Sequence, residues 1–270
     1  MNSATSVTQF QDTRIAGLIH SVRLGNPWLW RTVIAMLIGS VLLFVLQLFD
    51  QRLINGVSVW DKPAKFFLSL AVQYGTVSWA LNLLPDADRL NKGIKRAVFL
   101  MLFSGWAEMA YIVFRAMRGE ASHFNTGTLF SSIAYSVMGV GAVSLTVTAA
   151  FVGWRIFRRS NKTIWQAAAG LGLMVGAVLG TIAGSYMSAH SGHWVGGVQS
   201  DANSLTFFNW STTGGDLRVA HFVGLHAAQF IALSALTRSR NVVYLTCIGS
   251  AILTGILLVT SGSGIPLFIP

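Results

Sequence analysis

The stretch LWRTVIAMLIGSVLLFVLQLF (residues 29–49) holds one charged residue in 21 positions and no proline. An α-helix needs about 20 mainly apolar residues to cross a bilayer. The stretch is long enough for that, and it is longer than the apolar part of a cleavable signal peptide, which covers about 7–15 residues. We therefore predict a first transmembrane helix here and no cleavable signal peptide.

Similar apolar stretches recur along the rest of the chain. The chain is 53% apolar and only 10% charged, whereas a soluble domain carries about 25% charged residues. This composition indicates an all-α, polytopic membrane helix bundle that is surrounded by a lipid bilayer. We predict seven transmembrane helices within a membrane domain at 29–262, and the six further spans lie near 64–84, 97–117, 127–156, 165–188, 219–236 and 242–262.

Basic residues are concentrated in alternate connections between these spans. Because cytoplasmic loops of membrane proteins are enriched in Lys and Arg, the pattern places these connections in the cytoplasm. The N-terminus is then cytoplasmic and the C-terminal tail, 263–270, lies outside. The net charge of +10 therefore reports topology, and we predict no nucleic-acid partner. The basic residues are Arg14, Arg23, Arg31, Arg89, Lys92, Lys95, Arg96, Arg155, Arg158, Arg159, Lys162, Arg238 and Arg240.

The cytoplasmic N-terminal segment, residues 1–28, contains apolar residues at helical spacing between positions 10 and 22. This spacing predicts a short amphipathic helix on the inner membrane surface. The alternative is a disordered tail.

The fifth predicted span carries Gly172, Gly176, Gly180 and Gly184 at a strict spacing of four residues. Small residues on one helix face allow a second helix to approach closely. We predict a close helix contact along this face. The alternative is a smooth groove for a flat cofactor, a quinone or a lipid chain.

Polar residues form a stripe on the third predicted span. Ser104, Glu108, Tyr111 and Arg115 follow the spacing of one helix face. A carboxylate near the middle of a bilayer is costly unless it is paired, protonated or facing a wet cavity. Glu108 is therefore either functional, or part of a structural ion pair with Arg115 or Lys65 as its partner, or a protonated carboxyl that bonds another helix.

The second predicted span carries a polar arc of the same kind, made of Lys65, Ser69, Gln73 and Thr76. The sixth begins with Arg218, His221, His226 and Gln229, which share an arc of somewhat less than half the helix. Lipid would not tolerate this arc, so it should face the interior of the bundle. His221 and His226 are five residues apart, whereas metal pairs on one helix usually stand four apart.

Two connections on the outer side carry further polar residues. The first contains His123 and Asn125, and the second, 189–218, contains His190, His193, Asp216 and several aromatic residues. A structureless loop of that length is usually functional or disordered. The aromatic residues favour a lid that folds onto the bundle.

Several chemistries lack their sequence motifs. Cys247 is the only cysteine, which excludes an intramolecular disulfide, a CxxC pair and a CxxCH haem-attachment motif. The chain contains neither a Walker A loop nor HExxH.

The segments WDKPAKF (60–66), RGEASHFN (118–125) and FNWSTTGGDLRVAHFVGLHAAQ (208–229) resemble motifs of an uncharacterised family of bacterial multi-pass inner-membrane proteins. The resemblance implies a location in the bacterial inner membrane and implies no activity. Seven spans with scattered histidines are also superficially similar to ceramidase-like zinc hydrolases, but the closing HxxxH pair of those enzymes is missing.

Three functions fit these features. The first is a membrane enzyme or electron carrier with haem b or zinc, which needs histidine ligands and polar groups nearby. In this hypothesis His123, His221 and His226 bind the cofactor, and any zinc ligands come from these three with His190 and His193. Catalytic roles fall to Glu108, Asp216, Arg115 and Arg218, and a small-molecule or quinone substrate contacts Lys65, Gln73, Asn125 and Gln229.

The second function is a transporter or channel for a small anion or protons, in which buried Glu108 binds or relays the ion. The third is a sensor or assembly factor that uses the loop 189–218 as a docking surface. Substitution of Glu108 would abolish activity in the first two cases and matter little in the third.

Overall fold

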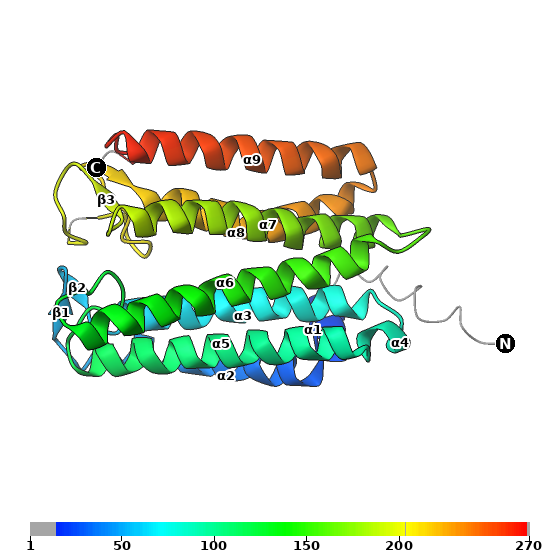
Figure 1. Ribbon diagram of the computed structural model, residues 1–270, viewed down its shortest axis with the longest axis horizontal. Helices are drawn as coiled ribbons and strands as arrows, with labels where there is room; N and C mark the ends of the chain where they lie inside the picture. Colours follow the sequence, from blue (N-terminus) through cyan, green and yellow to red (C-terminus); the bar gives the residue numbers. More distant parts are fainter. Residues whose placement is uncertain (1–14, 203, 269–270) are drawn as a thin grey trace.

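A computed structural model describes residues 15–202 and 204–268 (Figure 1). Helices dominate this part of the chain, and the only β-structure in it consists of two-residue strands and one isolated bridge. The elements are α1 (Ile15–Gly25), α2 (Pro27–Leu46), β1 (Leu53–Ile54), β2 (Val57–Ser58), α3 (Asp61–Asn82), α4 (Asp86–Arg89), α5 (Lys92–Met117), α6 (Leu129–Phe157), α7 (Ile164–Ala189), β3 (Trp194–Val195), β4 (Gly215–Asp216), α8 (Leu217–Ser234), η2 (Ala235–Thr237) and α9 (Arg240–Gly262).

Among the described residues, six helices are long and apolar enough to cross a membrane. These are α2, α5, α6, α7, α8 together with η2, and α9, and they match six of the predicted spans within a few residues. The remaining predicted span, 64–84, corresponds to α3. Its 22 residues are sufficient in length, but Asp61, Lys62 and Lys65 at its start make it more polar than the others. The prediction of a multi-pass membrane protein is therefore confirmed, with six candidate spans among the described residues.

The bundle has two ends of different character. We call the end that carries the four strands and residues 118–128 the strand end (left in Figure 1). The opposite end carries the connections 83–91, 158–163 and 235–239, and we call it the basic end. Asp86 and Asp88 at the basic end pair with Arg89 and Arg159, respectively.

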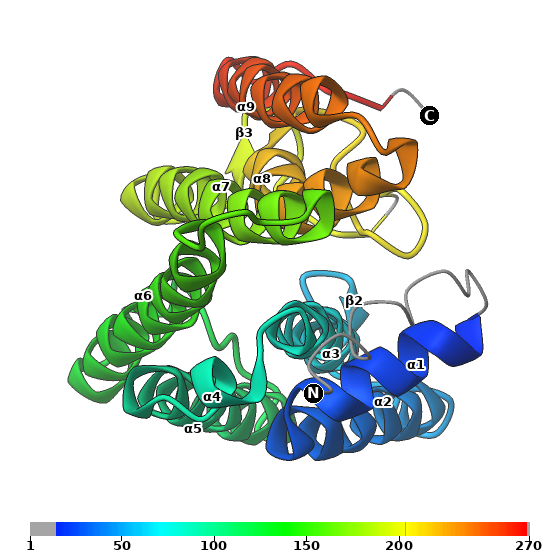
Figure 2. The same cartoon turned by 90° about the vertical axis from the view of Figure 1, so that its right-hand side faces the viewer.

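The long helices form two groups that α6 connects, as Figure 2 shows in the view along the bundle. In the first group, α3 packs against α1, α2 and α5. In the second, α8 packs against both α7 and α9. Helix α6 contacts α5 on one side and α7 on the other. The central helices of the two groups, α3 and α8, thus face each other, and their backbones approach closely at few points.

Helix α1 confirms part of the predicted amphipathic helix, since residues 15–25 are helical and lie against α3. Ser78 of α3 fixes this contact, because its hydroxyl donates to the carbonyl of Val22 and accepts from the amide of Asn26. Residues 10–14 of the prediction lie outside the described residues. The alternative of a disordered tail is wrong for residues 15–25.

The glycine stripe of α7 makes the predicted close helix contact, and the helix that occupies it is α8. A Cβ atom at Gly172 would lie 2.6 Å from the carbonyl oxygen of Ala228, and one at Gly176 would lie 2.9 Å from the amide nitrogen of Ala228. Gly180 and Gly184 meet Leu225 and His221 in the same way. Because α8 occupies this face, the alternative of a groove for a cofactor, a quinone or a lipid chain is wrong.

Substitution of Gly172 by alanine should destabilise the protein. The added methyl group would collide with the backbone of α8, and overpacking of this kind costs about 1–3 kcal/mol. Thermal unfolding in detergent should show a lower midpoint for Gly172→Ala. The matched control is Gly249→Ala in α9, where nothing lies within 4 Å of the added Cβ and alanine improves helix propensity by about 1 kcal/mol. Equal midpoints for both variants would contradict the close α7–α8 contact.

Candidate functional site

The unusual polar residues of the chain gather at and below the strand end, on α3, α5, α8 and the connections above them. The connection between α7 and α8 closes this region. Its strands β3 and β4 pair Trp194 with Asp216 and Val195 with Gly215, and a bridge joins Leu205 to Trp210. The described part of the predicted long loop is thus folded. We call residues 190–216 the lid.

The lid rests on the turn between β1 and β2. The amide of Asp201 donates to the carbonyl oxygen of Asn55 at 2.8 Å, and the hydroxyl of Ser200 donates to the same oxygen at 3.2 Å. Two segments that are far apart in the sequence therefore cover the strand end together. This arrangement confirms that the loop folds onto the bundle.

Arg218 anchors the lid from the first turn of α8. Its Nε and Nη2 atoms donate to the two carboxylate oxygens of Asp216 at 2.9 and 2.6 Å, and Nη2 also donates to Asp201 at 2.8 Å. Nη2 bonds the carbonyl oxygen of Asn209 as well. Asp216 in turn caps α8 by accepting from the amide of Arg218. Both residues, predicted as catalytic, are therefore fully engaged in holding the lid.

A hydrogen bond to a carboxylate joins the lid to α3. The side-chain amide of Asn209 donates to Asp61 at 2.7 Å, and the same carboxylate oxygen lies 2.7 Å from Nζ of Lys65. Lys65 is thus paired within its own helix and does not pair with Glu108. This corrects one of the two partners expected for Glu108.

The other expected partner, Arg115, is also engaged elsewhere. Its Nη1 lies 2.9 Å from Glu120, and its Nε donates to the carbonyl oxygen of Ala121 at 3.3 Å. The guanidinium reaches toward the end of α5 and holds the turn that follows it. The structural ion pair between Arg115 and Glu108 is therefore not formed, although both residues lie on one stripe.

Glu108 lies inside the bundle with 7% of its surface exposed. Its Oε1 atom has no hydrogen-bond partner within residues 15–202 and 204–268, and the same holds for the hydroxyl of Tyr111 one turn away. Gly141 of α6 leaves room for the carboxylate, because a Cβ there would lie 3.1 Å from Oε1. The charged group that acts electrostatically on Glu108 is Lys62, in the first turn of α3.

The predicted polar arcs of α3 and α8 meet below this point. The side-chain amide of Gln229 donates to the hydroxyl of Thr76 at 2.8 Å, and Oε1 of Gln229 lies 3.1 Å from Nδ1 of His226. At 1.5 Å per residue, Thr76 lies about 22 Å along α3 from Asp61. This chain of hydrogen bonds between half-buried side chains therefore joins the two helix groups far from the strand end. Gln73 lies half-buried on the same α3 arc.

The histidines are distributed over separate partners. Nδ1 of His221 lies 3.0 Å from the carbonyl oxygen of Gly180, and Nδ1 of His190 lies 3.1 Å from that of Tyr186. His193 stacks on Trp194 with ring centroids 3.9 Å apart. Where the structure describes the chain, no three His, Cys, Asp or Glu side chains converge as a metal site. The predicted zinc site, which needs three of these histidines together, thus lacks support.

His123 lies in an aromatic cage at the strand end. Its ring centroid is 5.6 Å from that of Phe66 and 6.1 Å from that of Tyr135. Burial, with the nearby charges of Lys62 and His221, lowers the pKa of His123 well below the ordinary value of 6.5. His123 is therefore neutral at physiological pH and lies close to both of these residues. Asn125, in the same connection, bonds the backbone at Ala121 and Gly127.

The lid carries a coupled pair beside Arg218. Burial lowers the pKa of His193. For Asp201, burial opposes ionisation, but the nearby ring of His193 and the ion pair with Arg218 outweigh it and lower the pKa. The lid thus contains an ionised aspartate and a neutral histidine at neutral pH.

Sequence reasoning missed Lys62. The structure places it near Glu108 and His123, where its charge acts on both. The available signal was its spacing, because Lys62 precedes Lys65 by three residues and so shares its face of α3. The predicted span began at residue 64, whereas α3 begins at Asp61 and Pro63 belongs to its first turn, where proline is well tolerated.

Comparison of the chain with protein-family models, curated proteins and solved structures gives no match.

The stability of the folded protein should fall as the pH drops below about 6.5. His123 and His193 have lowered pKa values, so the unfolded chain binds more protons than the folded one in this range. Each histidine can contribute up to about 1.4 kcal/mol per pH unit. Thermal unfolding measured between about pH 7.5 and pH 5.5 should show a smaller loss of stability on acidification for His123→Gln than for the wild type. The exposed His190 provides the control, since His190→Gln should keep the wild-type dependence of stability on pH. The same pH dependence in all three proteins would contradict the burial of His123.

Proposed function

We propose that the chain crosses the membrane seven times, with α3 as the seventh span and the basic end in the cytoplasm. The central position of α3 in its helix group supports a spanning role despite its polar start. The positive-inside rule supports the orientation, which places the strand end and the lid outside. The motif resemblance supports the bacterial inner membrane as the location.

We propose further that the protein transports protons or a small anion between its two helix groups. The observation that carries the proposal is the hydrogen bond from Gln229 to Thr76, which joins two polar helix faces across the middle of the bundle. Helices that only stabilise each other in a membrane do so well with small apolar residues, as α7 and α8 do here. A polar interface of this depth is costly and is typical of an ion or substrate route.

Glu108 and Lys62 fit the role of the ion-carrying groups. Glu108 has an unpartnered carboxylate oxygen, and Lys62 is the charge that acts on it. A proton or anion that arrives from the strand end would meet these two groups first, since Arg218 and Arg115 are already paired. The carboxyl of Glu108 can take up and release a proton, while the ammonium of Lys62 compensates the charge.

The route does not continue to the basic end in this conformation. Apolar residues fill the bundle there, and Trp79 and Trp165 are in edge-to-face contact with ring centroids 6.1 Å apart. Transport therefore requires the two helix groups to move relative to each other, with α6 as their connection. Rocking of one helix bundle against another around a central site is a common mechanism of secondary transporters.

Substitution of Glu108 by glutamine should remove transport and leave the fold intact, because the amide keeps the shape and loses the exchangeable proton. Purified protein in liposomes with an internal pH-sensitive dye and a potassium diffusion potential should show proton flux. Replacing the external chloride by gluconate tests whether an anion moves with the proton. We expect a loss of about tenfold or more for Glu108→Gln.

The control for this experiment is Asp86→Asn at the basic end, where the carboxylate is 81% exposed. It should keep the wild-type flux. Wild-type liposomes that carry neither protons nor chloride above the empty-liposome rate would contradict the transport proposal. Unchanged flux in Glu108→Gln would also contradict it and favour a docking role for the lid.

A second candidate is an electron carrier with haem b, and one observation favours it. Nδ1 of His221 faces a backbone carbonyl oxygen, which would leave its Nε2 available to hold a haem iron, and His123 lies near His221. Haem would supply one-electron redox chemistry. This candidate predicts a Soret absorption band in the protein purified with mild detergent. The band should disappear in both His123→Ala and His221→Ala, while His190→Ala should keep it.

A further inference from the structure

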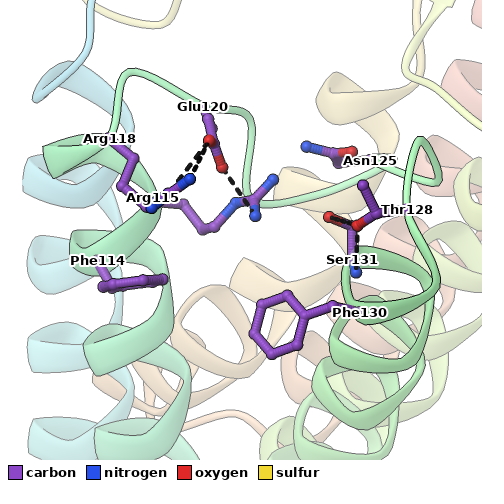
Figure 3. A pocket seen from close by; sticks show the side chains of 8 residues that line it. All are labelled: Phe114, Arg115, Arg118, Glu120, Asn125, Thr128, Phe130 and Ser131. Atoms are coloured by element: carbon purple, nitrogen blue, oxygen red, sulfur yellow. Dashed lines mark hydrogen bonds and ion pairs between the residues drawn. The ribbon is translucent and has the colours of Figure 1, made fainter.

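A cavity of about 470 Å³ lies between the strand ends of α5 and α6, away from Glu108 (Figure 3). Polar groups from the end of α5 and the start of α6 surround it, and two aromatic rings flank it. The residues that matter for its chemistry are Phe114, Arg115, Arg118, Glu120, Phe130 and Ser131. None of them has a role in the transport route proposed above.

The cavity carries an excess positive charge. The single carboxylate of Glu120 is shared by two guanidinium groups, since Arg115 approaches one of its oxygens at 2.9 Å and Arg118 approaches the other at 3.0 Å. The hydrogen bond from Arg118 lowers the pKa of Glu120, so the carboxylate is ionised at neutral pH. The three residues together keep one positive charge. Each guanidinium has five N–H donors; some of them bind Glu120 and the carbonyl of Ala121, and both side chains line the cavity (Figure 3).

The start of α6 adds further attraction for an anion. Thr128 caps this 29-residue helix by accepting a hydrogen bond from the amide of Ser131. The hydroxyl of Thr128 also donates to that of Ser131 at 2.9 Å, and both side chains face the cavity. The first turn of a helix carries a partial positive charge that favours anions. The charge of the two arginines and the dipole of α6 therefore act on the same space.

The aromatic rings lie closer to the middle of the bundle than the charged groups. Phe114 stands one turn before Arg118 on α5, and Figure 3 shows its ring and that of Phe130 below the polar rim. The two side chains are 47% and 62% exposed. Since α5 and α6 are candidate membrane spans, the order from the helix ends inward is charge, hydroxyl and aromatic ring. A phospholipid presents the matching order of phosphate, glycerol and acyl chain.

We propose that this cavity binds the phosphate group of a phospholipid, whose acyl chains lie along Phe114 and Phe130. Arg118 and the residual charge of the Arg115–Glu120 pair bind the phosphate, and the Ser131 hydroxyl contacts the headgroup. A soluble phosphate ion would share the polar contacts but would leave the two exposed rings without a partner. The proposal depends on α5 and α6 spanning the membrane and is independent of the transport function.

Native mass spectrometry of the whole detergent-purified protein tests the proposal. The probes are phosphatidylglycerol, a diglucosyl diacylglycerol that lacks phosphate, and inorganic phosphate. We expect retained phosphatidylglycerol with the wild type and a loss of about fivefold or more with Arg118→Gln. Ser131→Ala, which keeps every charge, should reduce the retention of phosphatidylglycerol less than Arg118→Gln does. The matched control is Arg96→Gln, which removes an exposed arginine from the basic end of the same helix and should retain the lipid.

Three outcomes would overturn the proposal. Equal retention of the glycolipid would show that phosphate is not recognised. Equal losses for Arg118→Gln and Arg96→Gln would show that binding depends on overall charge and not on this cavity. Displacement of the lipid by millimolar inorganic phosphate, with phosphate retained in its place, would identify a soluble anion as the ligand. Because proton flux is measured separately, failure of the lipid site and failure of the transport function can be distinguished.

Discussion

The guanidinium of Arg218, at the start of α8, bonds Asp216, Asp201 and the carbonyl of Asn209 in the lid. Asn209 in turn bonds Asp61 in the first turn of α3, so three segments are held together. A buried charge is tolerated only when it is paired and hydrogen-bonded. Asp216 and Asp201 meet this requirement and are themselves fixed by it, because Asp216 also caps α8. Loss of one partner from such a group costs about 3–5 kcal/mol. The position of the lid therefore depends on Arg218.

The lid in turn determines what the interior of the bundle can be. It covers the strand end between two helix groups whose central members carry polar faces. Without the lid, the polar faces of α3 and α8 would be open to bulk water at the strand end, while apolar side chains would still close them at the basic end. With it, the region around Lys62, Glu108 and His123 is enclosed, and charges there interact more strongly than they would in water. The close α7–α8 contact gives the second helix group the rigidity to hold its half of this interface.

Much of the fold could be predicted from the sequence, because apolar length and glycine spacing are local signals. The span predicted at 165–188 lies within α7 (Ile164–Ala189), and its glycine face was correctly assigned to a helix contact. The apolar signal of a membrane span is weaker for α3, because Asp61, Lys62 and Lys65 lie at its start. Which helix fills the glycine face could not be predicted, since spacing identifies a face and not its partner.

The site could be predicted only in part, for a related reason. Gln229 and Thr76, one from each predicted arc, do meet, because a helix fixes the direction of each side chain. The partners of Arg115 and Lys65 were assigned wrongly. A long side chain reaches about one turn beyond its own Cα, so Arg115 pairs with Glu120 past the end of α5 and leaves Glu108 alone. Helical spacing does not show how far a long side chain extends past the end of its helix, or where the following connection places its residues.

The contrast between Arg218 and Glu108 bears most directly on function. Arg218 is partly buried at the strand end, with 25% of its side chain exposed, and Glu108 is buried within a candidate membrane span; each charge must be offset by a partner. Arg218 has several bonded oxygens around it, and its conformation is complete without any further molecule. Glu108 has an oxygen with no partner among the described residues and a lysine nearby that is not bonded to it. The fold offsets the charge of Arg218 with its own carboxylates and leaves one oxygen of Glu108 without a partner among the described residues. Glu108 can therefore bind a partner that is not part of the chain and that binds reversibly. A proton or a small ion is a partner of that kind, and the site around Glu108 is therefore the place where the chemistry of this protein is to be sought.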